Sequence, residues 1–330
     1  MSKSDKKNKN NLQELLDDLK KEFGEGAIMS LEKIPKVNVE VISTGSPSLD
    51  FALGVGGLPR GRIIEIFGPE SSGKTTLALS VAAQVQKQNG NVAFIDTEHA
   101  LDPEYAKRIG VNLEKLVISQ PDSGEDALNI AEKLTRSTLF DLIIIDSVAA
   151  LVPRAELEGE VGDQFIGLQA RMMSQALRKL TGIISKTRTV LIFINQTRAM
   201  IGGMIPGQET TPGGKALKFY ASIRIELKRV SQVKKGEEII GNRIKARIVK
   251  NKTAPPFKST EFEIYYNEGI SYEADLLTLG EKIGVIKKSG NSYYFGEIKI
   301  GSSFQSARET LKEDQELTKK ILTAIYKEYE

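Results

Sequence analysis

Residues 68–75 read GPESSGKT, and this stretch decides how the rest of the chain is interpreted. It matches G-x-x-x-x-G-K-[ST], in which glycines let the backbone curl so that several N–H groups point at a phosphate. The apolar run 63–67 precedes it and the helix-forming TLALSVAAQVQ follows, which completes the strand–loop–helix context of a phosphate-binding loop. The positive end of the helix dipole favours the same anion. The predicted nucleotide-binding residues are Gly68, Pro69, Glu70, Ser71, Ser72, Gly73, Lys74, Thr75 and Thr76.

Two features predict that Mg²⁺ accompanies the nucleotide. Lys74 can reach the β- and γ-phosphates, and the Thr75 hydroxyl can ligate the metal. Asp146 follows four apolar residues, 142–145, and an acid that ends a buried strand is costly unless a cation pairs it. The alternative is that Asp146 only starts a turn or caps a helix. We expect Thr75 and Asp146 to be the metal ligands.

Hydrolysis also requires a group that orients or deprotonates water. Glu98 follows the predicted strand 92–96, whose end should lie near the phosphate loop. Gln196 follows the predicted strand 190–195 and precedes a glycine-rich loop, so it can sense the γ-phosphate and relay the nucleotide state to that loop. The alternatives are that Glu98 caps a turn and that Gln196 is merely a polar strand end. With Lys74, these are the predicted catalytic residues.

Short apolar runs alternate with helical stretches from about residue 61, which predicts an α/β domain with a mainly parallel sheet. Later strands follow one another with little helix between them, so that end of the sheet is expected to be antiparallel. The predicted strands are 63–67, 92–96, 142–146, 190–195, 223–227 and 244–249, and the predicted helices are 74–88, 124–136 and 168–186.

The two ends of the chain have a different texture. Residues 1–10 are polar and lysine-rich and are expected to be flexible, whereas 11–23 have helical spacing of leucines that must dock on the chain or on another protomer. Near residue 272 the pattern shifts to short pieces rich in Lys and Glu, and it ends in a helical segment at 308–329. We therefore expect an N-terminal helix and oligomerisation segment (1–35), a core (36–271) and a small C-terminal domain (272–330).

The composition of the 330 residues excludes several classes of protein. Hydrophobic residues make up 40% and charged residues 27%, an ordinary globular mix. No stretch approaches the roughly 20 apolar residues that span a bilayer, and the basic N-terminus has no apolar run after it, so we expect neither a membrane partner nor a secretory signal. Cysteine is absent, which excludes disulfides and thiolate zinc sites. Because only one histidine is present, a histidine-rich metal centre is excluded too. A reducing cytoplasmic compartment is the simplest interpretation.

Positive charge is concentrated in residues 215–252, which hold twelve Lys or Arg and three Glu, although the whole chain carries only +3. Such clustering is typical of a surface that neutralises a phosphate backbone, and the long loop 197–214 just before it could fold around a ligand. The alternative is a solvated sheet edge protected by lysines. Arg171 and Arg178, seven residues apart on one helix face, could supply further phosphate contacts.

These motifs together resemble the bacterial RecA recombinase family. The resemblance covers residues 43–269 in order, and both ends more weakly. It implies a P-loop NTPase core of RecA type, with a central mainly parallel twisted sheet flanked by helices, a small N-terminal helix/strand segment and a small α+β C-terminal domain. The matching strings are GPESSGKTTLAL, FIDTEHALDPEYA, LIIIDSVAALVPRAELEGEVGD, ARMMSQALRKL, FINQTR, ETTPGGKALKFYAS and IVKNKTAPPFK.

The resemblance also implies roles for residues. Glu98 would activate water and Gln196 would sense the γ-phosphate, while Tyr105 would lie against adenine with Asp102 also at the nucleotide. Loops 158–167 and 197–214 would contact DNA. The implied DNA-binding residues are Arg171, Arg178, Arg198, Gly213 and Gly214. Phe219 and Lys218 would contact the neighbouring protomer. Lys250 and Lys252 would reach the γ-phosphate of the ATP bound to that protomer.

The implied activity is an ATP- and Mg²⁺-dependent helical filament on single-stranded DNA that pairs double-stranded DNA, exchanges strands and stimulates self-cleavage of a LexA-like repressor. Met200 and Ile201 stand where the family often has a second basic residue, which would weaken one DNA contact. Many relatives end in an acidic tail that restrains duplex binding, and without one we expect less Mg²⁺-dependent autoinhibition. A ring-forming helicase of the same fold and a small-molecule P-loop kinase remain the alternatives.

Overall fold

The computed structural model describes residues 3–24, 39–160, 163, 165, 167–199 and 209–328, and it separates into two units, 1–39 and 40–330. In the first unit, α1 (Lys3–Phe23) begins earlier than its leucine spacing predicts. Residues 3–10 belong to this helix because they contain neither Gly nor Pro, and lysine is a good helix former. Their flexibility stays a prediction. Leu12, Leu15 and Phe23 are exposed within this unit. The strand expected within residues 1–35 could only fall on 25–35, outside the described residues.

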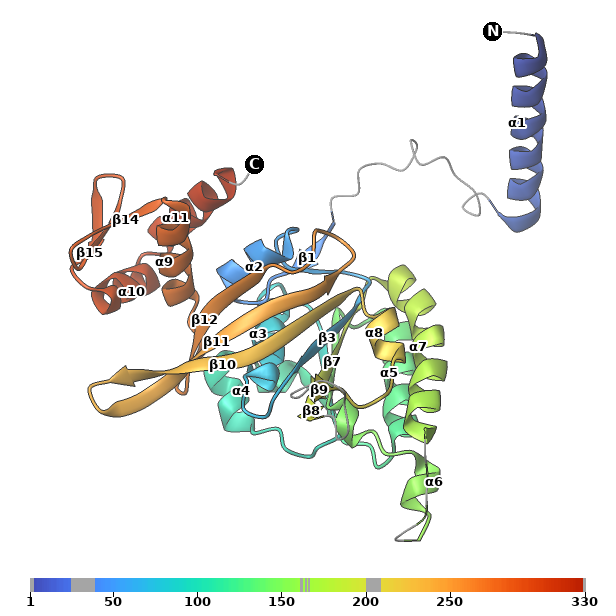
Figure 1. Ribbon diagram of the computed structural model, residues 1–330, viewed down its shortest axis with the longest axis horizontal. Coiled ribbons are helices and arrows are strands. Elements are labelled where there is room, and N and C mark those ends of the chain that lie inside the picture. The colour runs from blue at the N-terminus through green and yellow to red at the C-terminus, as the bar shows by residue number, and fades with distance from the viewer. Residues whose placement is uncertain are drawn as a thin grey trace. The chain divides into compact units, whose positions relative to one another are not determined.

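A nine-stranded sheet forms the centre of the second unit, in the order β13-β12-β11-β10-β3-β7-β6-β4-β5 (Figure 1). Strands from β10 to β5 are parallel, and β10 to β13 are antiparallel, as predicted. All six predicted strands are present, and the structure adds β5, β12 and β13. The strands are β3 (Ile63–Gly68), β4 (Val92–Asp96), β5 (Leu116–Ser119), β6 (Leu142–Asp146), β7 (Val190–Gln196), β10 (Ile223–Lys235), β11 (Glu238–Asn251), β12 (Ser259–Tyr265) and β13 (Gly269–Ile270).

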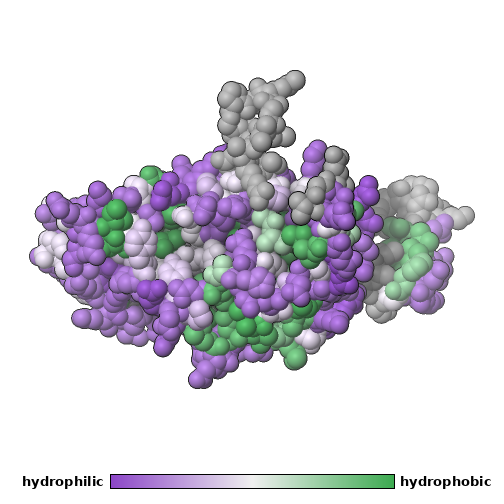
Figure 2. All heavy atoms as spheres, turned by 90° about the horizontal axis from the view of Figure 1, so that it is seen from below, coloured by the Kyte–Doolittle hydropathy of each residue, from purple (hydrophilic) through white to green (hydrophobic). Residues whose placement is uncertain are grey.

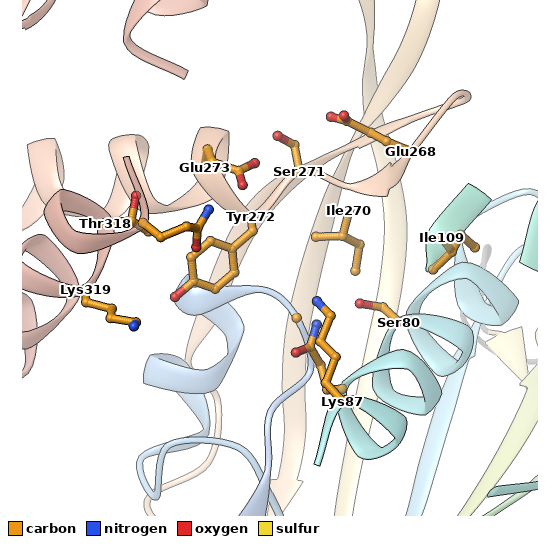
Figure 3. Close-up of a pocket in the computed structure, with 13 residues that line it drawn as sticks. Ser80, Lys87, Ile109, Glu268, Ile270, Ser271, Tyr272, Glu273, Thr318 and Lys319 are labelled. Atoms are coloured by element: carbon orange, nitrogen blue, oxygen red, sulfur yellow. The ribbon is translucent and has the colours of Figure 1, made fainter. Parts of the chain in front are cut away.

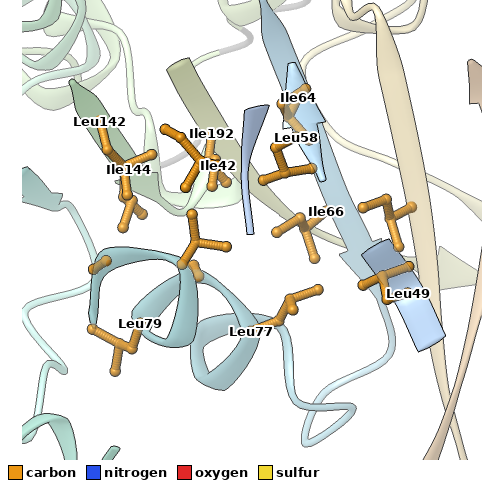
Figure 4. Packing of buried hydrophobic residues seen from close by; sticks show 14 of the residues in the cluster. Ile42, Leu49, Leu58, Ile64, Ile66, Leu77, Leu79, Leu142, Ile144 and Ile192 are labelled. Atoms are coloured by element: carbon orange, nitrogen blue, oxygen red, sulfur yellow. The ribbon is translucent and has the colours of Figure 1, made fainter. Parts of the chain in front are cut away.

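Helices cover both faces of this sheet, which is why its central strands are continuously apolar. Ile64 and Ile66 pack with α2 and α3 on one face (Figure 4), whereas Ile63 packs with α5 and α7 on the other. The three predicted helices are found within a residue of their expected ends. The helices are α2 (Pro47–Leu53), α3 (Lys74–Lys87), α4 (Pro103–Ile109), α5 (Gly124–Arg136), α6 (Arg154–Leu157), α7 (Leu168–Thr187) and α8 (Ala216–Tyr220).

Short elements complete the core. These are β1 (Val41–Ile42), β2 (Leu58–Pro59), η2 (Leu113–Lys115), η3 (Val148–Ala150), β8 (Arg198–Ala199) and β9 (Glu209–Thr210). The face seen in Figure 2 is mostly hydrophilic, with its largest group of apolar residues near the lower centre. In the described residues no helix is both long enough and apolar enough to cross a lipid bilayer.

The C-terminal part has its own apolar core, built from helices around a three-stranded antiparallel sheet. Its final helical stretch is two helices rather than the single one predicted at 308–329. Asp314 ends the first helix, and its carboxylate accepts the Leu317 N–H at 2.9 Å to begin the second. The elements are α9 (Tyr272–Ile283), β14 (Ile286–Ser289), β15 (Ser292–Phe295), β16 (Ile298–Gly301), α10 (Phe304–Glu313) and α11 (Gln315–Lys327).

A buried carboxylate joins the C-terminal part to the core. Asp275 on α9 accepts the Ser46 hydroxyl at 2.6 Å and the Ser48 N–H at 2.9 Å, both at the start of α2. A polar cavity of about 460 Å³ lies beside this joint, between α3 and the helices α9 and α11 (Figure 3). Because the joint excludes water from an acid, its stability should depend on pH.

Replacing Asp275 by Asn should flatten this pH dependence. Burial raises the pKa of the Asp275 carboxyl from 3.8 to about 6, so the folded chain keeps a proton that the unfolded chain releases. The contribution to stability is full below pH 3.8 and falls as the pH rises to about 6, by roughly 3 kcal/mol. An asparagine oxygen can still accept from Ser46 and Ser48. Urea unfolding between pH 4 and 7 should show a smaller decline in Asp275→Asn than in wild type.

The exposed cap Asp314 supplies the control, because Asp314→Asn preserves a good N-cap without touching the joint. It should retain the wild-type decline. Identical pH slopes for wild type and Asp275→Asn would contradict the assignment of the titration to Asp275.

Candidate active site

The backbone of residues 68–75 adopts the curled geometry that its glycines predict. A Cβ on Gly68 would lie 2.2 Å from the Leu227 carbonyl oxygen, so only glycine fits there. Gly73 has φ +87° and directly precedes α3, and Ser71 also has a positive φ of 57°. A backbone of this kind can direct N–H groups at an anion in front of the N-terminus of α3. The Ser72 hydroxyl is buried there without a hydrogen-bond partner in the described structure.

Lys74 folds back over this loop, and its Nζ donates to the Pro69 carbonyl at 2.7 Å. Burial lowers the pKa of the ammonium group, while Asp146, Glu98 and Glu70 oppose that shift. A cation that is partly desolvated and held by one neutral carbonyl is well suited to exchange that partner for phosphate oxygens.

Thr75 and Asp146 meet as the sequence predicts. The Thr75 hydroxyl donates to Asp146 Oδ2 at 2.7 Å, although 71 positions separate the two residues. Burial raises the pKa of the Asp146 carboxyl to about 6; the Thr75 hydrogen bond lowers it, and nearby Glu98 raises it further. The residues fit Mg²⁺, because a hydroxyl and a buried acid that lacks a full counter-charge are two hard oxygen ligands, with phosphates left to supply others.

Glu98 lies beside this pair, held by the neighbouring strand ends. The Thr97 N–H and hydroxyl both donate to the Asp146 carbonyl, at 2.8 and 2.9 Å, which ties the end of β4 to the end of β6. Glu98 itself accepts a hydrogen bond from the Ser147 hydroxyl and is exposed. Buried Asp96 fixes the following turn by accepting the Ala100 and Leu101 N–H groups. Glu98 is thus presented to solvent next to Asp146.

Gln196 is adjacent to the phosphate loop. It ends β7 directly beside Gly68 in the parallel register, and the Thr197 N–H donates to the Gly68 carbonyl at 3.1 Å. Gln196 is half-buried. The first residue of the 197–214 loop is therefore hydrogen-bonded to the first residue of the phosphate loop.

Tyr105 lies on α4 and Asp102 caps that helix, which packs beside α3. The Tyr105 hydroxyl is 2.8 Å from Thr76 Oγ1, and its ring is partly buried beneath the Arg108 guanidinium, 5.6 Å from the ring centre. Asp102 is exposed and caps α4 by accepting the Glu104 N–H at 2.9 Å. Tyr105 is thus tied to the start of α3, whereas Asp102 has a structural task of its own.

The two loops predicted to contact DNA converge on α7. Gln169 donates to the Val148 carbonyl at 2.9 Å and accepts the Gly213 N–H at 3.1 Å. A Cβ on Gly213 would lie 2.8 Å from Val148, and one on Gly214 would lie 2.8 Å from Ala170, so both glycines permit close packing. The end of the 197–214 loop is therefore fixed to the start of α7, at the end of the 158–167 loop.

The remaining predicted DNA contacts are placed less completely. Arg171 and Arg178 are both exposed and line a shallow groove on α7. Arg198 lies on β8, which pairs with β9. Met200 and Ile201 lie outside the described residues, as do 161, 162, 164 and 166 of the earlier loop.

The predicted interface residues form a separate group. Lys250 Nζ donates to the carbonyls of Lys218 and Phe219 at 2.7 and 2.8 Å, and Lys252 reaches the latter at 3.5 Å. The Phe219 side chain is 70% exposed. Among the hydrogen bonds of the described residues, neither lysine contacts the chain's own phosphate loop, so the structure does not bring them into this site.

Residue-by-residue interpretation missed several supports of the site. Thr97, Ser147 and Gln169 hold the predicted residues through bonds to strands and loops far away in the sequence. Asn195 gave one usable signal, since it is a polar residue in the otherwise apolar strand VLIFINQ. It is fully buried.

Comparison with known proteins agrees with this geometry. The models of the RecA N-terminal and C-terminal domains match residues 10–271 and 274–330. The chain is 57% identical to Protein RecA of Caldanaerobacter subterraneus, covering 94% of this chain and 91% of that protein. It is 58% identical to Protein RecA of Chlorobium limicola, covering 94% and 89%.

A solved structure supports the fold alone. The RadB recombinase crystal structure superposes with a TM-score of 0.53 at 23% identity, covering 70% of this chain and 98% of that one.

The Protein RecA of Listeria monocytogenes, 54% identical over 97% of this chain and 92% of its own, extends the sequence match almost to both ends. The chain therefore belongs to the RecA family of recombinases, which are DNA-dependent ATPases.

Proposed function

We propose that the chain assembles on single-stranded DNA as a helical, ATP-bound filament that pairs homologous double-stranded DNA and exchanges strands in recombinational repair. The observation that carries this proposal is the contact between the two loops: Gln196 lies beside Gly68, and Thr197 N–H binds the Gly68 carbonyl. A change in the phosphate loop can therefore alter the segment that grips DNA.

In the proposed site, Thr75 and Asp146 hold Mg²⁺ and Lys74 binds the β- and γ-phosphates. The metal, when bound, neutralises phosphate charge. Glu98 orients the attacking water and accepts its proton, a role supported by its exposed position next to Asp146. Gln196 binds the γ-phosphate end, and Tyr105 with Asp102 flanks the base.

The proposed coupling is an equilibrium between two states of the 197–214 loop. ATP favours the state that binds DNA, and hydrolysis removes the γ-phosphate contact and favours release. By reciprocity, DNA must raise the affinity for ATP by the same factor. Contacts from Arg171, Arg178, Arg198, Gly213 and Gly214 would be to the DNA backbone, so binding should be salt-sensitive and weakly sequence-dependent.

The proposed filament contact uses the group on α8. The exposed ring of Phe219, with Lys218, would pack on the next protomer, and Lys250 and Lys252 would reach that protomer's γ-phosphate. Segment 1–35 would supply the second half of the contact, which is supported by the exposed leucines of α1. We retain 36–271 as the ATPase and DNA-binding core and 272–330 as the C-terminal domain.

Two further activities belong to this proposal. The filament would act in the cytoplasm, and it would stimulate self-cleavage of a LexA-like repressor in the SOS response to DNA damage. Both rest on membership of the RecA family at 54–58% identity.

Electron microscopy of the protein with single-stranded DNA, Mg²⁺ and a non-hydrolysable ATP analogue tests the proposal. Open helical filaments are expected, together with ATP hydrolysis that DNA stimulates without any added acceptor. Closed rings that unwind duplexes would instead indicate a helicase, and hydrolysis that requires a small-molecule acceptor would indicate a kinase. Either result would overturn the proposed filament.

Replacing Gln196 by Ala should separate binding from coupling. The variant should retain ATP binding, because the phosphate loop and Lys74 are unchanged and only the contact at the γ-phosphate end is lost. Stimulation of the ATPase by single-stranded DNA should fall at least about tenfold, which corresponds to a typical allosteric coupling energy. Gln88→Ala, an exposed glutamine at the C-terminal end of α3, is the matched control. Unchanged stimulation in Gln196→Ala would exclude it as the relay.

A further inference from the structure

A row of polar side chains crosses four neighbouring strands beneath α8. Asn195 on β7 donates to Glu65 on β3 at 3.0 Å. Glu65 also accepts a hydrogen bond from Arg224 on β10 and forms an ion pair with it. Arg224 lies opposite Glu65 in the parallel register. Because side chains alternate along a strand, these three residues lie on the face that α7 and α8 cover.

A β-bulge brings Lys250 of β11 into the same row. Arg224 pairs with Lys250, but the next residue, Ile225, pairs with Ile248, so Val249 is the extra residue. Strict alternation would place Lys250 on the face of Ile248; the bulge turns it toward α8 instead. The row is therefore Asn195, Glu65, Arg224 and Lys250, and we call it the polar row.

The two ends of the polar row hold the two ends of one segment. Asn195 Nδ2 also donates to the Pro212 carbonyl at 3.2 Å, at the exit of the 197–214 loop. Lys250 donates to the carbonyls of Lys218 and Phe219, at the end of α8. Segment 212–219 is thus fastened at its start by Asn195 and at its end by Lys250. Asn195 binds Glu65 directly, and Lys250 lies opposite Arg224 in the pairing of β11 with β10.

The chemistry of the polar row is unusual for a sheet interior. Glu65 is 1% exposed and Asn195 is fully buried, with its carboxamide oxygen unpartnered in the described structure. Buried polar groups normally have partners, and those that lack them call for an explanation. Apolar side chains in place of Glu65 and Arg224 would fill the same space. The polar row is therefore better explained by its bonds to segment 212–219 than by packing.

We propose that Asn195 and Glu65 are positioning residues that make the exit of the 197–214 loop and the α8 helix with Phe219 move as one unit with Gln196. Asn195 is covalently next to Gln196, so a shift of the strand end at the γ-phosphate pulls on Pro212 through Asn195. The same shift reaches Lys218 and Phe219 through the Glu65–Arg224 ion pair and the pairing of β10 with β11, which carries Lys250. This inference rests on the proposed function and extends it, because it links DNA grip to the protomer contact within one chain.

Lys250 has a special place in this arrangement. Its ammonium group cannot bind the α8 carbonyls and a neighbour's phosphate with the same N–H groups in the same geometry. When it leaves for the phosphate, it frees the end of α8, where Phe219 lies. The polar row would then coordinate filament contact with release of that helix end.

Asn195→Ala provides the test. The affinity of the full-length protein for a fluorescent single-stranded oligonucleotide is measured by anisotropy with the non-hydrolysable ATP analogue and with ADP. The ratio of the two affinities should fall at least about tenfold, whereas affinity for the ATP analogue without DNA should stay near wild type. Glu65→Gln preserves shape but removes the charge that faces Arg224 and Lys250, and it should lower the ratio in the same direction. It also keeps the inference testable if Asn195→Ala fails to fold.

Asp141→Asn is the control for general loss of stability. It removes an ion pair with Arg60, 2.7 Å long, just before the start of β6 and therefore at the opposite end of the parallel strands. It should lower the melting temperature and leave the affinity ratio unchanged. A wild-type ratio in Asn195→Ala or Glu65→Gln, or a loss of ratio in Asp141→Asn of equal size, would overturn the inference. If the wild-type protein bound the oligonucleotide equally well with the ATP analogue and with ADP, the proposed function would be overturned, and this inference with it.

Discussion

Lys74→Ala should reduce ATP hydrolysis by at least about 100-fold, because a positioned charge on a transferring phosphoryl group contributes several kcal/mol to transition-state stabilisation. The ammonium group is held over the phosphate loop by the Pro69 carbonyl, and alanine removes it. Nucleotide-dependent filament formation should weaken as well. Hydrolysis is measured by release of inorganic phosphate with and without single-stranded DNA.

The matched control is Lys87→Ala, at the far end of the same helix α3. It should keep the wild-type hydrolysis rate. Because neither lysine is a buried core side chain, the melting temperatures of both variants should stay close to wild type. Normal turnover in Lys74→Ala would contradict the assignment of the nucleotide site to residues 68–76.

Glu98→Gln should slow hydrolysis by about 100- to 10,000-fold while leaving ATP binding intact, the range expected when a general base is lost. The change is isosteric, and the glutamine oxygen can still accept from the Ser147 hydroxyl, so the strand ends should keep their arrangement. A variant that binds ATP but rarely hydrolyses it should remain in the DNA-binding state. Its dissociation from single-stranded DNA in ATP should therefore be slower than that of wild type.

Glu104→Gln, an exposed change in the first turn of α4, serves as the comparison. It should hydrolyse ATP and release DNA at wild-type rates. Fast hydrolysis in Glu98→Gln would mean that another group activates the water, and Glu98 would then have only its structural bond to Ser147.

Much of the fold and part of the site were predictable because they depend on local patterns. Continuous apolar runs identified the central strands, and 3.6-residue spacing identified α3, α5 and α7 almost to their ends. Asp146 and Glu98 were recognisable because parallel strands present their carboxyl ends at one edge, where the phosphate loop also lies. The β5 strand could not be predicted because four residues are too few to show an alternation of apolar and polar side chains. The helix break at Asp314 could not be predicted because the buried residues of α10 and α11 continue one amphipathic pattern.

The phosphate loop could be identified from its amino acids alone, since glycine positions and an adjoining helix N-terminus create an anion site wherever that segment folds. The meetings of distant residues emerge only in the folded chain: Thr75 with Asp146, Gln169 with Gly213, and Asn195 with Glu65 and Pro212. The bulge at Val249, which turns Lys250 toward α8, arises from the pairing of β10 with β11. The physical reason is that a strand's own sequence specifies which residues share its faces, whereas the register between strands is set by the packing of all of them together.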